Sequence, residues 1–291
     1  MPPTAQLVIG PAGCGKSTYC TEMQAHLDSL KRASSVVNLD PAAEAFGYRV
    51  SLDVRELVSL EETCKVEGLG PNGGLLRCME VLEDHLSSWL VAGLDETCGD
   101  NDETYVLFDC PGQVELYSHV PVFRRLTEAL VGHGFNVCAV YMMDAQFVSE
   151  PAKFVAGTLA VLSAMVLLEV PHVTVLSKMD ICTEPKRVQE LIGGVGGGPD
   201  DGGVDDEGEG ISYGYGGGAN MALLLAELND TSAATSTLRA LNESLARLID
   251  DYSLVSFVPL DIRNEDSFAE VLHHVDCATQ YGEDKEVKDV L

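Results

Sequence analysis

The chain has 291 residues, of which 46% are hydrophobic and 22% are charged, so it can form a globular protein with a substantial core. Its formal net charge of −28 disfavours direct binding to nucleic acids and anionic membranes, because an acidic surface repels phosphate groups. No apolar run is expected to cross a bilayer, and the N-terminus lacks the basic region of a signal peptide. The nine cysteines are scattered without a CxxC pair, which predicts reduced thiols, an intracellular protein and no zinc site.

Short apolar runs alternate with longer helical patterns along the chain. The apolar runs predict strands at 7–9, 36–39, 105–108, 137–143, 173–176 and 254–258. The helical patterns predict helices at 16–31, 74–92, 120–131, 151–169, 220–250 and 265–280. Nearly continuous apolar strands separated by helices are typical of a parallel sheet buried on both faces. We therefore expect one three-layer α/β domain over residues 1–291.

The first predicted strand is followed by Gly-Pro-Ala-Gly-Cys-Gly-Lys-Ser at 10–17, which matches the phosphate-loop pattern G-x-x-x-x-G-K-[ST]. Glycines allow the loop to point its backbone N–H groups at phosphate oxygens, and the positive end of the next helix adds to this field. Lys16 can reach the β- and γ-phosphates, and the Ser17 hydroxyl can bind Mg²⁺. Because strand, loop and helix occur in the required order, the motif predicts binding of a nucleoside triphosphate.

Gly-Pro-Asn at 70–72 is a strong turn signal before an apolar run. The ordinary interpretation is a loop that precedes a helix. The second interpretation is that Pro71 stiffens the turn so that it presents Asn72 for use in a site. The turn by itself does not decide between them.

The third predicted strand leads into Asp-Cys-Pro-Gly-Gln at 109–113. Asp109 stands at the carboxyl end of a buried strand, where a carboxylate can hold Mg²⁺ directly or through water. The pattern resembles the D-x-x-G-Q element of switch-type GTPases, in which the glycine N–H senses the γ-phosphate and the glutamine region positions the attacking water. Glu115 is open to two interpretations, since it can polarise the same water or belong to the solvated surface.

Ser-Lys-Met-Asp at 177–180 follows another buried strand and resembles the N/T-K-x-D motif that reads a nucleotide base. Asp180 can accept hydrogen bonds from N1–H and the 2-amino group of guanine, and adenine offers no such pair of donors. The motif therefore favours GTP over ATP. Pro259 and Leu260, after the last predicted strand, are candidates to pack against the edge of the base.

The segment 193–218 departs from the alternating pattern. Half of it is glycine and it carries six acidic residues, with almost nothing to bury. Such a composition predicts a flexible, disordered surface insertion. An acidic recognition arm is the alternative.

The motifs GPAGCGKST, VVNLDPAAE, GPN, DCPGQVELY and SKMD occur in the order that is found in the GPN-loop GTPases, and the chain resembles this family. The C-terminal part is most similar to the third eukaryotic subtype. The resemblance covers nearly the whole chain outside 193–218. Five motifs in one order are far more specific than the phosphate loop alone.

Carried over by motif, the resemblance implies three groups of site residues. Phosphate and Mg²⁺ would be bound by Gly13, Cys14, Gly15, Lys16, Ser17 and Thr18. The metal and the attacking water would be served by Asp40, Asp109, Gln113 and Glu115. Guanine would be read by Ser177, Lys178 and Asp180. For Asp40 the residues alone also allow a simpler role, because it can end a strand and cap the next helix.

The resemblance also implies a dimer, either with a paralogous GPN-loop GTPase of the first subtype or between identical chains. The loop Gly70, Pro71 and Asn72 would project into the partner's active site. Asn72 would act there, and since an asparagine brings no positive charge we expect modest turnover. The resemblance further implies a role in assembly and nuclear import of RNA polymerase II, for a cytoplasmic protein that shuttles to the nucleus.

Two other functions are compatible with the phosphate loop. A P-loop kinase of a small molecule or nucleic-acid end needs an acceptor pocket, often with a pair of lid arginines, and Arg124 and Arg125 are the one adjacent pair in the chain. A GTP-binding scaffold with little turnover is the other. Preference for ATP and transfer of phosphate to an acceptor would indicate the kinase.

Overall fold

The computed structural model describes residues 2–99, 104–118, 120–192, 220–231, 236–251 and 255–282. The glycine-rich segment 193–218 lies outside the described residues. Within them, strands and helices alternate along the chain, as the sequence predicts.

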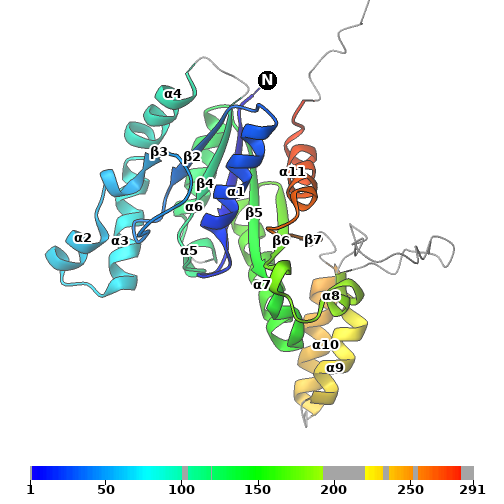
Figure 1. The fold of residues 1–291 in the computed structure, drawn as a ribbon. Coiled ribbons are helices and arrows are strands. Elements are labelled where there is room, and N and C mark those ends of the chain that lie inside the picture. Colours follow the sequence, from blue (N-terminus) through cyan, green and yellow to red (C-terminus); the bar gives the residue numbers. More distant parts are fainter. Residues whose placement is uncertain are drawn as a thin grey trace, which may run out of the picture.

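The centre of the molecule is a seven-stranded sheet in the order β3-β2-β4-β1-β5-β6-β7 (Figure 1). All of its pairs are parallel. The strands are β1 Thr4–Ile9, β2 Ser34–Asn38, β3 Val50–Asp53, β4 Tyr105–Asp109, β5 Asn136–Asp144, β6 His172–Ser177 and β7 Phe257–Pro259. In the central strands Val8 pairs with Asp109 and Ile9 with Tyr141, so the carboxyl ends of β1, β4 and β5 meet at one edge.

Helices cover both faces of the sheet. They are α1 Lys16–Ser29, α2 Leu60–Glu67, α3 Pro71–Asp84, α4 Ala92–Cys98, α5 Glu115–Ser118, α6 Val122–Gly132, α7 Pro151–Leu168, α8 Pro185–Ile192, α9 Met221–Thr231, α10 Ser236–Asp251 and α11 Glu265–Thr279. One hydrophobic cluster joins the sheet to α3, α6 and α7, and a second joins its other face to α1 and α11. This three-layer arrangement confirms the predicted α/β fold. The pair α2–α3 extends at one end and α8–α10 at the other (Figure 1).

Several elements differ from the sequence prediction. The strand β3 and the helices α2, α5 and α8 were not predicted. The strand β3 is short and partly exposed at the sheet edge, α2 buries none of its side chains, and α5 and α8 have four and eight residues. The helix predicted at 74–92 begins at Pro71 and passes through a π-helical turn, Leu86–Val91, into α4. The helix predicted at 220–250 consists of α9 and α10.

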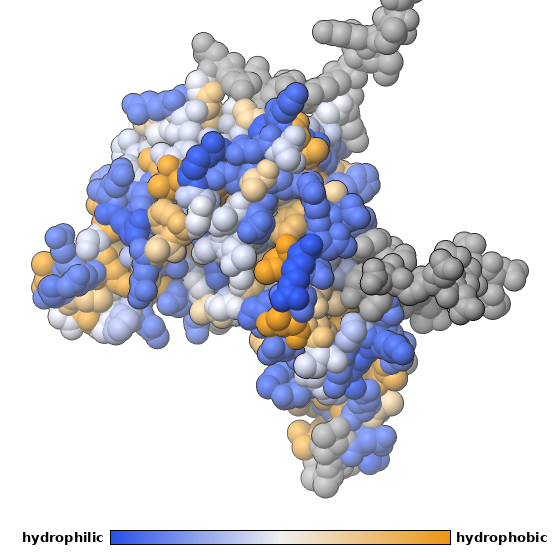
Figure 2. Space-filling view, viewed as in Figure 1, coloured by the Kyte–Doolittle hydropathy of each residue, from blue (hydrophilic) through white to orange (hydrophobic). Residues whose placement is uncertain are grey.

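The helix α7 corrects one expectation, since by length and composition it is apolar enough to cross a bilayer. A core helix of a soluble protein passes the same test, so the signal is weak. Here Phe154, Val161 and Leu168 pack into the larger hydrophobic cluster. Figure 2 shows hydrophilic residues over most of one face of the molecule, with apolar residues near α7 and at the tip of α2 and α3.

All nine cysteines lie among the described residues, and none of them forms a disulfide. Five are buried, where a thiol packs as a small apolar group: Cys14, Cys20, Cys78, Cys110 and Cys138.

Candidate functional site

The loop between β1 and α1 depends on glycine at three positions. Gly10, Gly13 and Gly15 have φ values of 137°, 77° and 95°, which side chains rarely adopt. At Gly10 a Cβ atom would also fall 2.4 Å from the carbonyl oxygen of Met142. The loop is thus held close to β5 and turns its backbone towards the space above the sheet edge.

Lys16 opens α1 and places its ammonium group inside this loop. Its side chain is 8% exposed, and Nζ donates to the carbonyl oxygens of Gly10 at 3.1 Å and Pro11 at 3.0 Å. No side chain among the described residues caps the N-terminus of α1. Lys16, Ser17 and Thr18 line one cavity, so the lysine charge and the N-terminus of α1 act on the same space, which suits an anion.

A cavity of about 490 Å³ lies against this loop. It brings together the phosphate loop, the residues after β2 and the segment after β4. Its lining consists of Ala12, Gly13, Gly15, Lys16, Ser17, Thr18, Asp40, Ala42, Cys110, Gly112 and Gln113. Segments far apart in the sequence thus form one polar cavity that is suited to the phosphate groups of a nucleotide.

Asp109 ends β4 and is 2% exposed. The Tyr48 hydroxyl donates to its Oδ2 at 2.9 Å, and the Ser17 hydroxyl also donates to it. Burial raises the pKa of Asp109 above its usual range, against the opposing effect of these hydrogen bonds and of the Lys16 charge. The neighbouring charge of Asp40 raises this pKa further.

Asp40 follows β2 and faces the same cavity. Its Oδ1 accepts the backbone N–H of Ala42 at 2.8 Å, and burial raises its pKa while this hydrogen bond and Lys16 lower it. The hydroxyl of Ser17 and the carboxylates of Asp40 and Asp109 form an all-oxygen donor set, which fits Mg²⁺. A divalent cation there would relieve the repulsion between the two carboxylates. No group of three or more His, Cys, Asp or Glu side chains that could hold a metal occurs in the described part of the chain.

Gly112 brings the segment after β4 into direct contact with the phosphate loop. A Cβ atom at this position would lie 2.7 Å from Cα and 3.0 Å from the backbone nitrogen of Ala12. Gln113 lines the cavity beside it. Glu115 begins α5 with an exposed side chain and is not among the residues lining the described cavity.

Ser177 ends β6 and is hydrogen-bonded to the backbone of the phosphate loop. It is 3% exposed, and its hydroxyl is shared between the carbonyl oxygens of Cys14 at 2.7 Å and Met143 at 3.1 Å. Cys14 is buried as well, and burial raises the pKa of its thiol. The contact of Ser177 is thus with the backbone of the loop that would hold phosphate.

Lys178 and Asp180 follow Ser177 in a short turn. Lys178 has φ 63° and its Nζ pairs with Asp144 Oδ2 at 2.6 Å. The Asp180 side chain is 9% exposed and lies 3.8 Å from the guanidinium of Arg263. The N–H of the intervening Met179 donates to the Leu260 carbonyl at 3.2 Å, so the loop after β7 lies beside this turn.

Pro259 and Leu260 are both buried, and the Leu260 side chain packs into the cluster under α1 and α11. The structure thus brings the backbone of Leu260 to the predicted base-side turn and directs its side chain into the core.

The Gly-Pro-Asn segment is the first turn of α3. Gly70 is the N-cap and accepts the N–H of Gly74 at 2.8 Å, and Pro71 occupies the first helical position. Gly70, Pro71 and Asn72 are exposed. The tip of α2 and α3 lies at one end of the molecule, and Asn72 is not part of the lining of the phosphate cavity in its own described chain (Figure 1).

The two adjacent arginines that a kinase lid would need form ion pairs outside the phosphate cavity. Arg124 pairs with Glu128 and Glu169, each at 3.1 Å, and Arg125 pairs with Glu83. Both arginines lie on α6, and neither lines the phosphate cavity as described.

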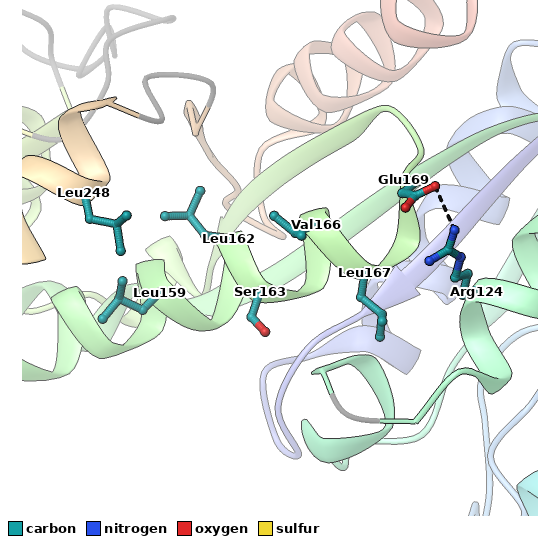
Figure 3. Close-up of a pocket in the computed structure, with 8 residues that line it drawn as sticks. All are labelled: Arg124, Leu159, Leu162, Ser163, Val166, Leu167, Glu169 and Leu248. Carbon is teal, nitrogen blue, oxygen red and sulfur yellow. Dashed lines mark hydrogen bonds and ion pairs between the residues drawn. The ribbon is translucent and has the colours of Figure 1, made fainter.

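An apolar hollow of about 570 Å³ lies along α7. Figure 3 shows leucine side chains along α7 and from α10 around it, with the Arg124–Glu169 ion pair at one end. It has no converging set of polar groups that could carry a reaction.

Sequence reasoning missed two contributors to the site. Asp144 stands at the carboxyl end of β5, and this placement could have identified it as a site carboxylate. Tyr48 lies in the irregular segment 41–49, which has no periodic pattern and no motif. Its contact with Asp109 spans 61 positions in the chain and is visible in the fold alone.

Comparison with known proteins gives consistent matches. A family model described as a conserved hypothetical ATP-binding protein matches residues 8–195. The protein named GPN-loop GTPase 3 from Mycosarcoma maydis is 43% identical over 286 residues, covering 98% of this chain and 94% of that protein. Its namesake from Danio rerio is 42% identical over 291 residues, with coverages of 99% and 92%. The one from Saccharomyces cerevisiae is 39% identical over 291 residues, with coverages of 97% and 94%.

Among solved structures, the apo form of a GTPase from Pyrococcus abyssi matches with a TM-score of 0.70. The match covers 94% of this chain and 97% of that chain at 23% identity. At this identity the likeness shows the fold, and it confirms the P-loop arrangement that the motif order predicts.

Proposed function

The chain belongs to the GPN-loop GTPase family, and on this premise we propose that it binds GTP and hydrolyses it to GDP and phosphate in the cavity at its phosphate loop. The observation that carries the proposal is the convergence at one cavity of the loop with Lys16, the carboxylates of Asp40 and Asp109, and the Gly112–Gln113 segment.

The residues around the cavity would have different roles in phosphoryl transfer. Backbone N–H groups of the loop and Lys16 would hold the phosphates, and Gln113 would orient the attacking water. Ser17, Asp40 and Asp109 would hold Mg²⁺, which when bound neutralises charge on the β- and γ-phosphates. Ser177 fixes the loop from below, because its hydroxyl bonds to the Cys14 carbonyl.

We further propose that the base is guanine. The description of the family model mentions ATP, and the names of the relatives mention GTP. The choice between the two bases therefore depends on the residues of the turn 177–180. The Asp180 carboxylate is a hydrogen-bond acceptor, and its side chain is 9% exposed. It lies three residues after Ser177, which ends β6 and is hydrogen-bonded to the phosphate loop. A carboxylate there can accept both guanine donors, and adenine would leave it unpaired.

Replacement of Asp180 by asparagine should therefore weaken GTP binding by about tenfold to a hundredfold, since two hydrogen bonds to a charged acceptor are lost. The same variant should gain affinity for xanthosine triphosphate, whose 2-oxo group accepts from the new amide. Competition of GTP, ATP and XTP against a fluorescent guanine nucleotide measures both effects. If ATP competes as well as GTP for the unaltered chain, guanine selection is wrong.

We also propose that the chain acts as a dimer, with a paralogous first-subtype partner or with a second copy, in which Asn72 reaches the partner's cavity. Support comes from the exposed position of Asn72 at the tip of α2 and α3, away from the cavity of its own chain. An exposed amide on a rigid first helical turn is well placed to donate to a phosphate or orient water across an interface.

Replacement of Asn72 by alanine should slow GTP hydrolysis in the assembled dimer by about tenfold to a hundredfold, because one hydrogen bond of the transition state is lost. Nucleotide affinity should stay within a factor of two, which binding of a fluorescent GDP measures. Size-exclusion chromatography checks that the variant still assembles. An unchanged rate in an intact dimer would refute the role of Asn72.

The family resemblance supports a wider proposal. We propose that the dimer takes part in assembly and nuclear import of RNA polymerase II, from the cytoplasm and with shuttling to the nucleus. The charge of −28 supports contact with protein surfaces and no direct contact with nucleic acid or membrane. Affinity purification from cells with GDP or a non-hydrolysable GTP analogue tests this. Recovery of polymerase subunits that depends on the nucleotide supports it, and their absence in both states contradicts it.

A further inference from the structure

The segment 41–49 follows Asp40, and Tyr48 in this segment is hydrogen-bonded to the carboxylate of Asp109. The Tyr48 hydroxyl donates to Asp109 Oδ2 at 2.9 Å, and Tyr48 is 7% exposed. Its ring stacks on Phe46 with centroids 4.6 Å apart and planes inclined by 10°. The Tyr48 side chain therefore reaches the buried end of β4, while Ala42 near the start of the segment lines the cavity.

Arg55 fixes the middle of this segment. Its guanidinium lies 4.7 Å from the centre of the Phe46 ring, and Nη1 donates to the Ala43 carbonyl at 2.9 Å. The same guanidinium holds the Asp53 carboxylate with Nε at 3.0 Å and Nη2 at 2.6 Å. A planar group with five donors can make all these contacts at once, and a lysine cannot.

Both ends of the segment are anchored as well. At the first end, Asn38 donates to Asp53 Oδ1 at 2.8 Å and accepts the N–H of Asp40 at 3.0 Å. At the far end, Gln24 of α1 accepts the N–H of Arg49 at 2.8 Å and donates to its carbonyl at 3.3 Å. The middle is therefore the part whose position depends on Tyr48 and on the Phe46–Arg55 stack.

Tyr48 is suited to hold a carboxylate in one orientation. A hydrogen bond to a buried ionised carboxylate is among the stronger ones in proteins. It holds the carboxylate of Asp109 in one orientation, and a divalent cation requires its ligands in a fixed arrangement.

We propose that Tyr48 is a positioning residue for Asp109 in the binding of Mg²⁺ with nucleotide, and that the Phe46–Arg55 stack couples this contact to the position of the segment 41–49. The inference rests on the proposed function. The coupling is reciprocal: because Tyr48 favours the state of Asp109 that binds Mg²⁺, bound Mg²⁺ with nucleotide strengthens the Tyr48 contact and holds the segment in place.

The first test is a titration of Mg²⁺ against binding of a fluorescent GDP to the full chain, followed by the nucleotide dissociation rate. In Tyr48→Phe the ring stack is kept and the hydroxyl is lost, so the half-saturating Mg²⁺ concentration should rise by about tenfold. GDP affinity in the presence of EDTA should be unchanged. The matched control is Tyr105→Phe. Tyr105 is buried as well and its hydroxyl also contacts an aspartate, Asp276, but it stands at the opposite end of β4.

The second test follows the middle of the segment by cleavage with the glutamate-specific endoproteinase Glu-C after Glu44, whose side chain is exposed. Mg²⁺ with GDP should slow this cleavage in the unaltered chain, and Tyr48→Phe should abolish most of the slowing. Arg55→Lys leaves the Tyr48 hydroxyl in place and removes the stack on Phe46. It should speed cleavage after Glu44 in the free chain by about tenfold. Thermal melting checks that each variant is folded.

The outcomes distinguish failure of the proposed function from failure of the inference about Tyr48. If the unaltered chain shows no Mg²⁺-dependent GDP binding, the proposed function fails. If it binds but Tyr48→Phe has the Mg²⁺ dependence and the Glu-C protection of the unaltered chain, the inference alone is overturned. A lower Mg²⁺ requirement in Tyr48→Phe also overturns it, because Tyr48 would then compete with the metal.

Discussion

Replacement of Lys16 by methionine should lower GTP affinity by about a hundredfold or more, since a charge and its hydrogen bonds to phosphate are lost. The lysine is 8% exposed and its ammonium group sits between the carbonyl oxygens of Gly10 and Pro11, at the centre of the loop. Methionine has a similar length and an apolar stem, so the packing of α1 should persist. Equilibrium binding of a fluorescent GTP analogue measures the loss.

Lys153→Met provides a matched control for this variant. Lys153 is 57% exposed on α7 and pairs with Glu150, outside the phosphate cavity. GTP binding by that control should equal that of the unaltered chain. Retention of GTP affinity within threefold in the Lys16 variant would show that the loop is not the phosphate site.

Replacement of Gly112 by alanine should slow GTP hydrolysis by about a hundredfold, as the loss of one transition-state donor does in other enzymes. The added methyl group would fall 2.7 Å from Cα and 3.0 Å from the backbone nitrogen of Ala12, and backbone atoms cannot move aside as a flexible side chain can. The segment that carries Gln113 must therefore shift away from the phosphate loop. Such overpacking also costs about 1–3 kcal/mol of unfolding free energy.

Single-turnover hydrolysis separates the rate from binding in the Gly112 variant. Gly132→Ala is the matched control, because a Cβ atom at the end of α6 meets no atom within 4 Å. The control should hydrolyse GTP at the unaltered rate. A normal rate in Gly112→Ala, with a normal melting temperature, would contradict the proposed contact between the two segments.

The fold and the phosphate end of the site follow from local signals in the sequence. The apolar runs of β1, β4, β5 and β6 are continuous because both faces of the sheet are covered, and such runs are readily recognised. The loop 10–17 and the segment 109–113 could be placed together because each follows the carboxyl end of a central strand. A rule of topology thus predicts a contact between residues nearly a hundred positions apart.

Contacts made by side chains of irregular segments could not be predicted in this way. Ser177 matches a base-reading motif by position, but its hydroxyl is used by the Cys14 and Met143 carbonyls. Tyr48 bonds to Asp109 because the segment 41–49 folds back across the sheet edge. The role of Asn72 depends on a second chain, so it stays a prediction.

Phosphate release from GTP, with ATP as the comparison, tests the central claim most directly. The measurement uses the full chain with Mg²⁺, alone and co-expressed with a paralogous partner, and the Lys16→Met variant sets the background. We expect free phosphate from GTP, faster in the assembled dimer, and none above background from ATP. Phosphate released preferentially from ATP, or no release above the Lys16→Met background in either assembly, would contradict a GTPase.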